Sequence, residues 1–134
     1  MGAKIACRLR SFVAATVLVA TLPSASALAE GVLLGSRTVR DGTDHDVISV
    51  ADGKQYNQVQ LCVANRSVTF YDVDIHFGNG GVQDVSMKVV LDPGQCTRWV
   101  DLAGDGARHI NRIDLWYSTL VNTGNQGVVS AYGR

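Results

Sequence analysis

Positions 71–77 read Tyr71-Asp72-Val73-Asp74-Ile75-His76-Phe77, a strict alternation of apolar and polar side chains. Successive side chains of a β-strand point to opposite faces, so this period of two predicts a strand with one buried and one solvated face. The same period recurs at 58–63, 85–91, 99–102 and 113–117, and less regular apolar segments occur at 32–39, 46–50 and 128–132. From position 30 onward, no segment shows a convincing helical period of 3.6 residues.

Turn-forming residues such as Asp52-Gly53 and Asp92-Pro93-Gly94 separate these segments. Their spacing of roughly 8–12 residues is typical of a β-sandwich. About eight short strands, each with one apolar face, must bury that face against a second sheet or close into a barrel. We therefore predict an all-β fold, an antiparallel β-sandwich (jelly-roll-like) of about eight short strands.

Residue parity predicts the register of a first hairpin, in which 70–77 pairs with 84–91. Cross-strand partners share a face, so apolar side chains must oppose apolar ones. The alternating apolar positions of both segments are odd-numbered, so the position numbers of two paired residues must add up to an even number. The loop between the strands then has an odd number of residues, which excludes a two-residue turn at Asn79-Gly80. Lys88 is then expected opposite Asp72 or Asp74.

A second hairpin is predicted between 97–102 and 111–118. Pairing Asp101 with Arg112 is favoured over pairing Asp101 with Asp114, because like charges directly opposite each other are destabilising.

The first 29 residues have the three parts of a secretory signal peptide. Three basic residues precede an uncharged apolar run at 12–22, and a small, polar segment ends in Ala27-Leu28-Ala29. The alternative, an N-terminal membrane anchor, is disfavoured because spanning a bilayer takes ~20 apolar residues. We predict a signal peptide at 1–29, with cleavage after Ala29 or after Ala27, and a single β-sandwich domain at 30–134 that is exported, either to the periplasm or into the medium.

The charge balance argues against nucleic-acid and membrane partners. The chain of 134 residues has twelve Lys and Arg against twelve Asp and Glu, and 46% of its residues are apolar. Without positions 1–29, nine basic residues face twelve acidic ones, a net charge of −3. A mildly acidic domain has no electrostatic reason to bind nucleic acid or anionic lipid. No later segment is apolar enough to span a membrane, so no membrane association is expected after cleavage.

Two cysteines, Cys62 and Cys96, remain after cleavage, because Cys7 leaves with the signal peptide. In an oxidising compartment they are expected to form a disulfide, with ~4 kcal/mol of stabilisation from loop closure. The alternative is a catalytic or metal-binding thiol. Against it, the pair forms no C-x-x-C motif, and neither cysteine has a neighbouring histidine.

Asp72, Asp74 and His76 are the candidate metal ligands, because positions i, i+2 and i+4 of a strand share a face. Alternate residues lie ~7 Å apart, however, and do not converge without a bend. The alternative is a solvated sheet face with Lys88 as the counter-charge. A second candidate is the acidic loop 41–46, whose spacing does not match an EF-hand. We predict no cofactor, with calcium or another divalent cation as the alternative.

Trp99 and Trp116 both alternate with apolar residues and are therefore expected to face away from the core, opposite each other. Asp101, Arg112 and Asp114 share their parity. Aromatic surface beside hydrogen-bonding groups suits a glycan or a protein partner. The alternative is that a loop or a terminal segment covers both indoles.

Enzyme signatures are absent from the sequence. It contains no G-x-S-x-G, H-E-x-x-H, P-loop or G-x-G-x-x-G motif, and its three histidines fit no zinc spacing. We therefore predict a non-catalytic binding module. A metal-binding or metal-stabilised domain is the first alternative, and a hydrolase with an unrecognised site is the second.

Several short segments together resemble a family of small exported bacterial proteins of unknown function. They are Leu34–Arg37, Asp44–Val50, Phe77–Gly80, Arg98–Leu102, Arg108–Ile110 and Ile113–Tyr117. The resemblance covers about residues 33 to 134. It implies a location in the bacterial envelope and a compact all-β domain, and it supplies no catalytic residues. The outward Trp99 departs from the looser family pattern.

Overall fold

The computed structural model describes residues 31–119 and 126–134, which form ten strands and no helix. The strands are β1 (Val32–Val39), β2 (Gly42–Ser49), β3 (Gln55–Tyr56), β4 (Gln58–Ala64), β5 (Val68–Phe77), β6 (Val82–Val85), β7 (Val89–Leu91), β8 (Val100–Asp101), β9 (Arg108–Thr119) and β10 (Gly127–Gly133). A search of the described residues for an apolar helix long enough to cross a membrane finds none. The predicted signal peptide lies outside the described residues.

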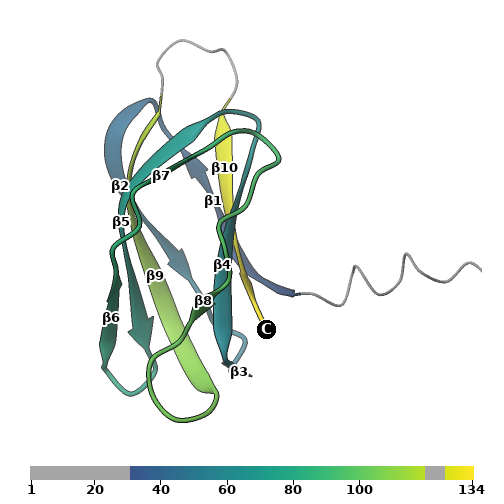
Figure 1. Cartoon of the computed structure of the whole chain (residues 1–134), viewed down its shortest axis with the longest axis vertical. Helices are drawn as coiled ribbons and strands as arrows, with labels where there is room; N and C mark the ends of the chain where they lie inside the picture. Colours follow the sequence, from purple (N-terminus) through teal and green to yellow (C-terminus); the bar gives the residue numbers. More distant parts are fainter. Residues whose placement is uncertain (1–30, 120–125) are drawn as a thin grey trace, which may run out of the picture. The chain divides into compact units, whose positions relative to one another are not determined.

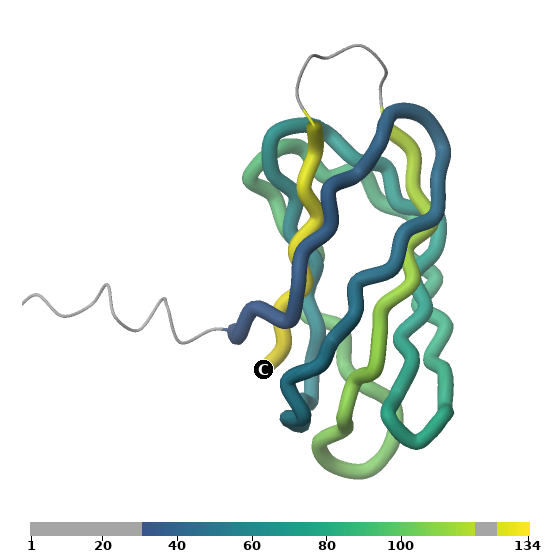
Figure 2. The backbone as a smooth tube through the Cα atoms, turned by 180° about the vertical axis from the view of Figure 1, so that it is seen from behind, coloured from purple at the N-terminus to yellow at the C-terminus, as the bar shows by residue number. Residues whose placement is uncertain are grey.

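The strands form two antiparallel sheets that face each other (Figure 1). One sheet has four strands in the order β1-β10-β4-β8, and the other has the order β2-β9-β5-β6, with β3 also paired to β9 and β7 to β5. Seen from behind, the chain passes from the first sheet to the second between β1 and β2 (Figure 2). The predicted all-β sandwich is confirmed. The described residues have two strands more than expected, because 85–91 divides between β6 and β7 and because β3 is added.

The core lies between the sheets and uses the apolar positions of the predicted alternation. Val59, Leu61 and Val63 of β4 are buried, and so are Ile113, Leu115 and Tyr117 of β9. The hydrophobic effect thus fixes which face of each strand turns inward. The polar side chains between these residues point away from the core.

Strand β5 departs from the predicted alternation at Tyr71. Phe70 pairs with Tyr117 and Asp72 with Trp116, so Tyr71 is an extra residue in the ladder with β9. Phe70 is fully buried, whereas Tyr71 is 46% exposed. The prediction that Tyr71 lies on the apolar face is therefore wrong, because a β-bulge inserts one unpaired residue and bends the strand.

In the first hairpin, the position numbers of the paired residues of β5 and β6 add up to an even number, as predicted. Val73 pairs with Val85, and the Phe77 amide donates to the Gly81 carbonyl at 2.8 Å, which leaves a three-residue loop. The prediction for Lys88 is wrong, because Asp84 is the residue opposite Asp74. Beyond β6 the register shifts by one residue, since β7 pairs Val89 with Phe70, and Lys88 lies in the irregular segment between the two strands.

The second predicted hairpin is absent from the described residues, and this prediction is wrong. Strand β8 pairs with β4 in the four-stranded sheet, where Asp101 lies opposite Gln58, while Arg112 and Asp114 belong to β9 in the other sheet. Parity constrains the register of two strands only if they are neighbours. Here the chain crosses between the sheets after β8 instead of turning back, and consecutive strands of a sandwich often do so.

The predicted disulfide is present and joins Cys62 of β4 to Cys96, with the two Cα atoms 4.0 Å apart. Backbone hydrogen bonds accompany it. The Val63 amide donates to the Gln95 carbonyl at 3.0 Å, and the Thr97 amide donates to the Leu61 carbonyl at 2.8 Å. The disulfide therefore holds the segment before β8 along β4. It is compatible with an extracytoplasmic location.

Tyr117 is fully buried, and its hydroxyl is hydrogen-bonded inside the sandwich. Its hydroxyl donates to Asp46 Oδ2 at 2.6 Å and accepts from the Arg40 amide at 3.2 Å. Burial and the hydrogen bond to Asp46 raise the pKa of Tyr117 to about 12.

We predict that Tyr117→Phe lowers the unfolding free energy by about 1–3 kcal/mol near neutral pH, because it leaves Asp46 and the Arg40 amide without this partner. The raised pKa also makes wild-type stability fall as pH rises from 10 towards 12, since the unfolded chain loses the proton first. The variant should lose less stability over this interval. Tyr56, whose pKa is also raised to about 12, should supply the remaining loss. Urea unfolding at a series of pH values measures both effects, with Tyr71→Phe as the exposed control. An unchanged alkaline loss in Tyr117→Phe would contradict the assignment.

Candidate functional site

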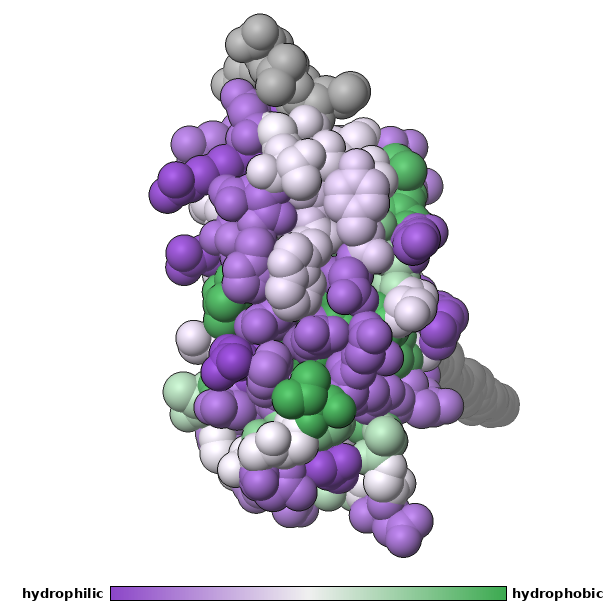
Figure 3. Space-filling view, turned by 90° about the vertical axis from the view of Figure 1, so that its left-hand side faces the viewer, coloured by the Kyte–Doolittle hydropathy of each residue, from purple (hydrophilic) through white to green (hydrophobic). Residues whose placement is uncertain are grey.

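The outer face of the six-stranded sheet gathers most of the ionisable residues singled out above. β2, β9, β5 and β6 contribute to it the following outward side chains: His45, Arg112, Asp114, Trp116, Asp72, Asp74, His76 and Asp84. Figure 3 looks onto this side of the molecule and shows hydrophilic residues over most of it, with isolated apolar patches. A stable sandwich requires no such gathering of charge, so this face is the candidate functional surface.

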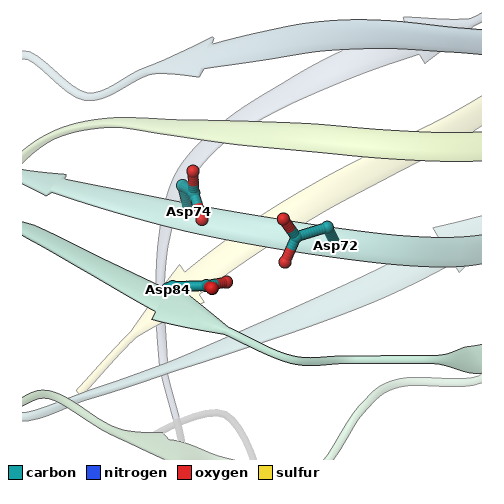
Figure 4. Close-up of side chains that lie close together, drawn as sticks. All are labelled: Asp72, Asp74 and Asp84. Atoms are coloured by element: carbon teal, nitrogen blue, oxygen red, sulfur yellow. The ribbon is translucent and has the colours of Figure 1, made fainter.

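Asp72, Asp74 and Asp84 form the aspartate trio. Each offers a carboxylate oxygen within 4.8 Å of the other two. Figure 4 shows Asp72 and Asp74 on β5 and Asp84 on the neighbouring β6, with their carboxylates turned toward one another. Asp74 and Asp84 are register partners, and the bulge at Tyr71 supplies the bend that a regular strand lacks.

The trio is crowded with negative charge. Burial raises the pKa of Asp72, and the hydrogen bond and charge of Asp84 raise it further, while Lys88 acts weakly in the opposite direction. Asp74 Oδ1 is buried and has no hydrogen-bond donor among the described residues. Buried polar atoms are nearly always satisfied in folded proteins. This arrangement therefore suits an additional positive group at the trio.

Asp114, the register partner of Asp74, is the centre of a second cluster on the same face. Its Oδ1 lies 3.2 Å from Arg112 Nε. Its Oδ2 lies 3.2 Å from His76 Nε2 and 3.8 Å from His45 Nε2. The His45 ring stacks on Trp116 with a centroid distance of 4.5 Å. His76 thus joins Asp114 rather than the trio.

The two tryptophans do not form a joint platform, because Trp99 precedes β8 and Trp116 lies on β9 in the other sheet. The Arg134 guanidinium carbon lies over the Trp99 ring, 4.3 Å from the ring centroid. The same ring packs against Gly31. Both indoles are half-buried. The prediction that both tryptophans share one surface for a glycan or protein partner is therefore wrong. The alternative, cover by a loop or a terminal segment, fits Trp99, which lies against Gly31 and Arg134, but Trp116 stacks on His45 of its own sheet.

The carboxylates of the acidic segment 41–46 engage separate partners. Asp41 pairs with the buried Arg66, and Asp46 accepts from Tyr117 and Arg37. Asp44 accepts from the His45 amide at 2.8 Å. Most of the segment is strand β2 rather than a loop. The alternative calcium site predicted there has no converging oxygens within the described residues.

Comparison of the sequence with models of protein families shows to which family the chain belongs. The family model described as "Domain of unknown function (DUF2541)" matches residues 11–133. The chain belongs to this family. The predicted kinship with a family of unknown function is thereby confirmed. No curated protein and no solved structure matches the chain.

In this DUF2541 domain, sequence reasoning found two of the three aspartates and missed Asp84. The signal was present in the first hairpin. An even register sum with a three-residue loop at 78–80 places Asp84 opposite Asp74. The second cluster gave no such signal, because His45 and His76 reach Asp114 from strands that are distant in the sequence.

Proposed function

We propose that this DUF2541 domain is an exported, non-catalytic binding module that holds a divalent cation at the aspartate trio. The observation that carries the proposal is the convergence of three carboxylates around Asp74 Oδ1, a buried oxygen with no hydrogen-bond donor among the described residues. The disulfide supports the exported location, because disulfides persist outside the cytosol.

A shared proton relieves only part of the repulsion. The hydrogen bond that raises the pKa of Asp72 joins it to Asp84, so these two carboxylates can hold one proton between them. Asp74 takes no part in that bond, and its Oδ1 has no hydrogen-bond partner in the part of the chain that the structure describes. A cation between the three groups would satisfy all of them.

The donor set indicates the class of ion. Carboxylate oxygens alone suit hard cations such as Ca²⁺, Mg²⁺ and Mn²⁺ and do not favour softer metals. Three carboxylates supply part of the coordination shell of such an ion, and water would supply the rest. The nearby Lys88 lowers the pKa of Asp72, but burial and Asp84 raise it more, and Lys88 makes no hydrogen bond to the buried Asp74 Oδ1.

Thermal unfolding of the purified protein at neutral pH tests the proposal. We expect Ca²⁺, Mg²⁺ or Mn²⁺ to raise the midpoint over that in EDTA. A cation present at a hundred times its dissociation constant adds about 2.7 kcal/mol to the unfolding free energy. Equal midpoints with EDTA and with each of the three ions would refute the site.

Variants separate the trio from general ionic effects. Asp74→Asn and Asp84→Asn should abolish the cation-dependent rise and should increase stability in EDTA, because each removes one repelling charge. Asp105→Asn, at an exposed position in the turn after β8, is the matched control and should keep the full rise. A rise that persists in both trio variants would place the cation elsewhere.

A further inference from the structure

A cavity of about 360 Å³ lies between the two sheets at the edge opposite β1 and β2. One wall consists of residues from segment 86–91, which includes β7, and the other wall is segment 96–98, which precedes β8. Figure 1 shows the chain passing from β7 in one sheet to the edge of the other sheet before it arrives at β8. We call this space the edge cavity, because each wall is the outermost segment of its sheet.

Both walls of the edge cavity are irregular. Between the partners of Val59 and Cys62, the outer segment 96–100 has one residue more than β4. Segment 85–89 likewise has one residue more than the part of β5 with which it pairs. An extra residue bends an edge strand and interrupts its ladder, and such bulges are common beside functional sites. The cavity lies where these two irregular segments face each other.

Hydrogen bonds connect the two walls at both ends of the cavity. At one end, the side chain of Gln83 donates to the Asp101 carbonyl at 3.0 Å and accepts from the Ala103 amide at 2.7 Å. At the other end, the Asp92 amide donates to Gln95 Oε1, and the Gln95 amide donates to the Asp92 carbonyl, both at 2.9 Å. The separation of the walls is therefore fixed before any ligand binds, as in most small-molecule sites.

The inner lining of the cavity suits an apolar group. Met87 and Leu91 are buried, and Val89 packs against the hydrophobic core. Thr97 is the buried polar side chain of the lining, and its hydroxyl already accepts from one backbone amide and donates to one backbone carbonyl. It needs no polar partner from a ligand. The inner lining thus favours contact with hydrocarbon.

The outer lining is positively charged. Lys88 and Arg98 are exposed and come from opposite walls, and no acidic residue lines the cavity. Neither takes part in an ion pair among the described residues. Lys88 also acts on Asp72 of the trio, so Arg98 supplies most of the attraction for an anion. Residues 30–134 have a net charge of −3, so these two cations do not follow from the overall charge.

We propose that the edge cavity binds an amphipathic organic anion, an alkyl chain that ends in a carboxylate or phosphate group. The chain would lie against Met87 and Leu91, and the anionic group would lie between Lys88 and Arg98. The volume is within the range of ~300–1,000 Å³ that is typical of small-molecule sites. The site goes beyond the cation proposed for the trio, because it shares no residue with the trio and takes a ligand of opposite charge.

NMR of the Met87 methyl group tests the proposal. The chain has two methionines, Met1 and Met87, and Met87→Leu identifies the signal of the second. Titration with octanoate or octyl phosphate should shift the Met87 signal to saturation, and the tighter of the two anions identifies the preferred head group. Octyl glucoside and octyltrimethylammonium carry the same chain without a negative charge and should bind much more weakly.

Two charge variants test the outer lining. Arg98→Gln and Lys88→Gln should each weaken the binding of octanoate by about fivefold, the effect of one partly exposed charge pair. Lys54→Gln is the matched control, because it removes a positive charge from an exposed position outside the cavity. It should bind octanoate like the wild type. All three side chains are exposed, so these variants should keep the thermal stability of the wild type.

Asp84→Asn keeps this site and the trio distinguishable. Measured in EDTA, it should bind octanoate like the wild type even though it lacks a trio ligand. The inference is overturned if neither anion shifts the Met87 signal, or if octyl glucoside binds as tightly as octanoate. It is equally overturned if Arg98→Gln and Lys88→Gln both bind octanoate like the wild type, or if Asp84→Asn abolishes the binding.

Discussion

Replacing Cys62 and Cys96 together by serine is expected to lower the unfolding free energy by roughly 4 kcal/mol. The disulfide closes a loop with a sequence separation of 34 residues, and opening it returns that loop's conformational freedom to the unfolded chain. For a domain of this size, the loss corresponds to a fall of roughly 15–30 °C in the unfolding midpoint. Calorimetry of the oxidised wild type and the double variant measures it.

Dithiothreitol provides the control for this prediction. It should lower the midpoint of the wild type to that of the double variant and should leave the double variant unchanged. Free Cys62 and Cys96 thiols in the native protein, or a midpoint difference of only a few degrees, would contradict the expected effect. In the double variant, unfolding should begin where the segment before β8 lies on β4, because without the disulfide, hydrogen bonds alone hold the segment there.

The local pattern of the sequence predicts most strands, because burial of one face imposes a period of two on each of them. Ile113, Leu115 and Tyr117 alternate with polar residues in the sequence and are buried in the structure. The cysteine pairing was predictable for a different reason: only two cysteines remain after the predicted signal peptide.

The choice of neighbouring strands was not predictable from that pattern. The alternation around Asp101 fits β4 as well as it fits β9, because parity says nothing about which sheet a strand joins. The local pattern therefore predicts one surface for the two tryptophans, whereas the structure places them on two. Only the packing of the whole sandwich decides this choice.

The candidate sites show the same division. Asp72 and Asp74 share a face by local geometry, which the sequence reveals. Their approach to Asp84 depends on one loop length and one bulge. The approach of His45 and His76 to Asp114 depends on the order β2-β9-β5, which no local pattern encodes.

Phe70→Ala should be among the most destabilising single substitutions in the domain, and Tyr71→Ala, one residue further along β5, should have little effect. Phe70 is fully buried, so truncating it leaves a cavity and costs about 3–5 kcal/mol. Tyr71 is 46% exposed, and its replacement should cost about 1 kcal/mol or less. Urea unfolding of the two variants in EDTA compares them without a contribution from bound cations.

This pair of variants tests the bulge on which the aspartate trio depends. Strict alternation from Phe77 back to Tyr71 would bury Tyr71 and expose Phe70, so a regular strand reverses the order of the two effects. A reversed order would remove the bend that brings Asp72 toward Asp74 and Asp84, and with it the geometry of the proposed cation site. A larger loss of stability in Phe70→Ala than in Tyr71→Ala would instead link the bulge at Tyr71 to the convergence of the three aspartates. The residue that breaks the apolar rhythm of β5 also lets alternate carboxylates of one strand converge.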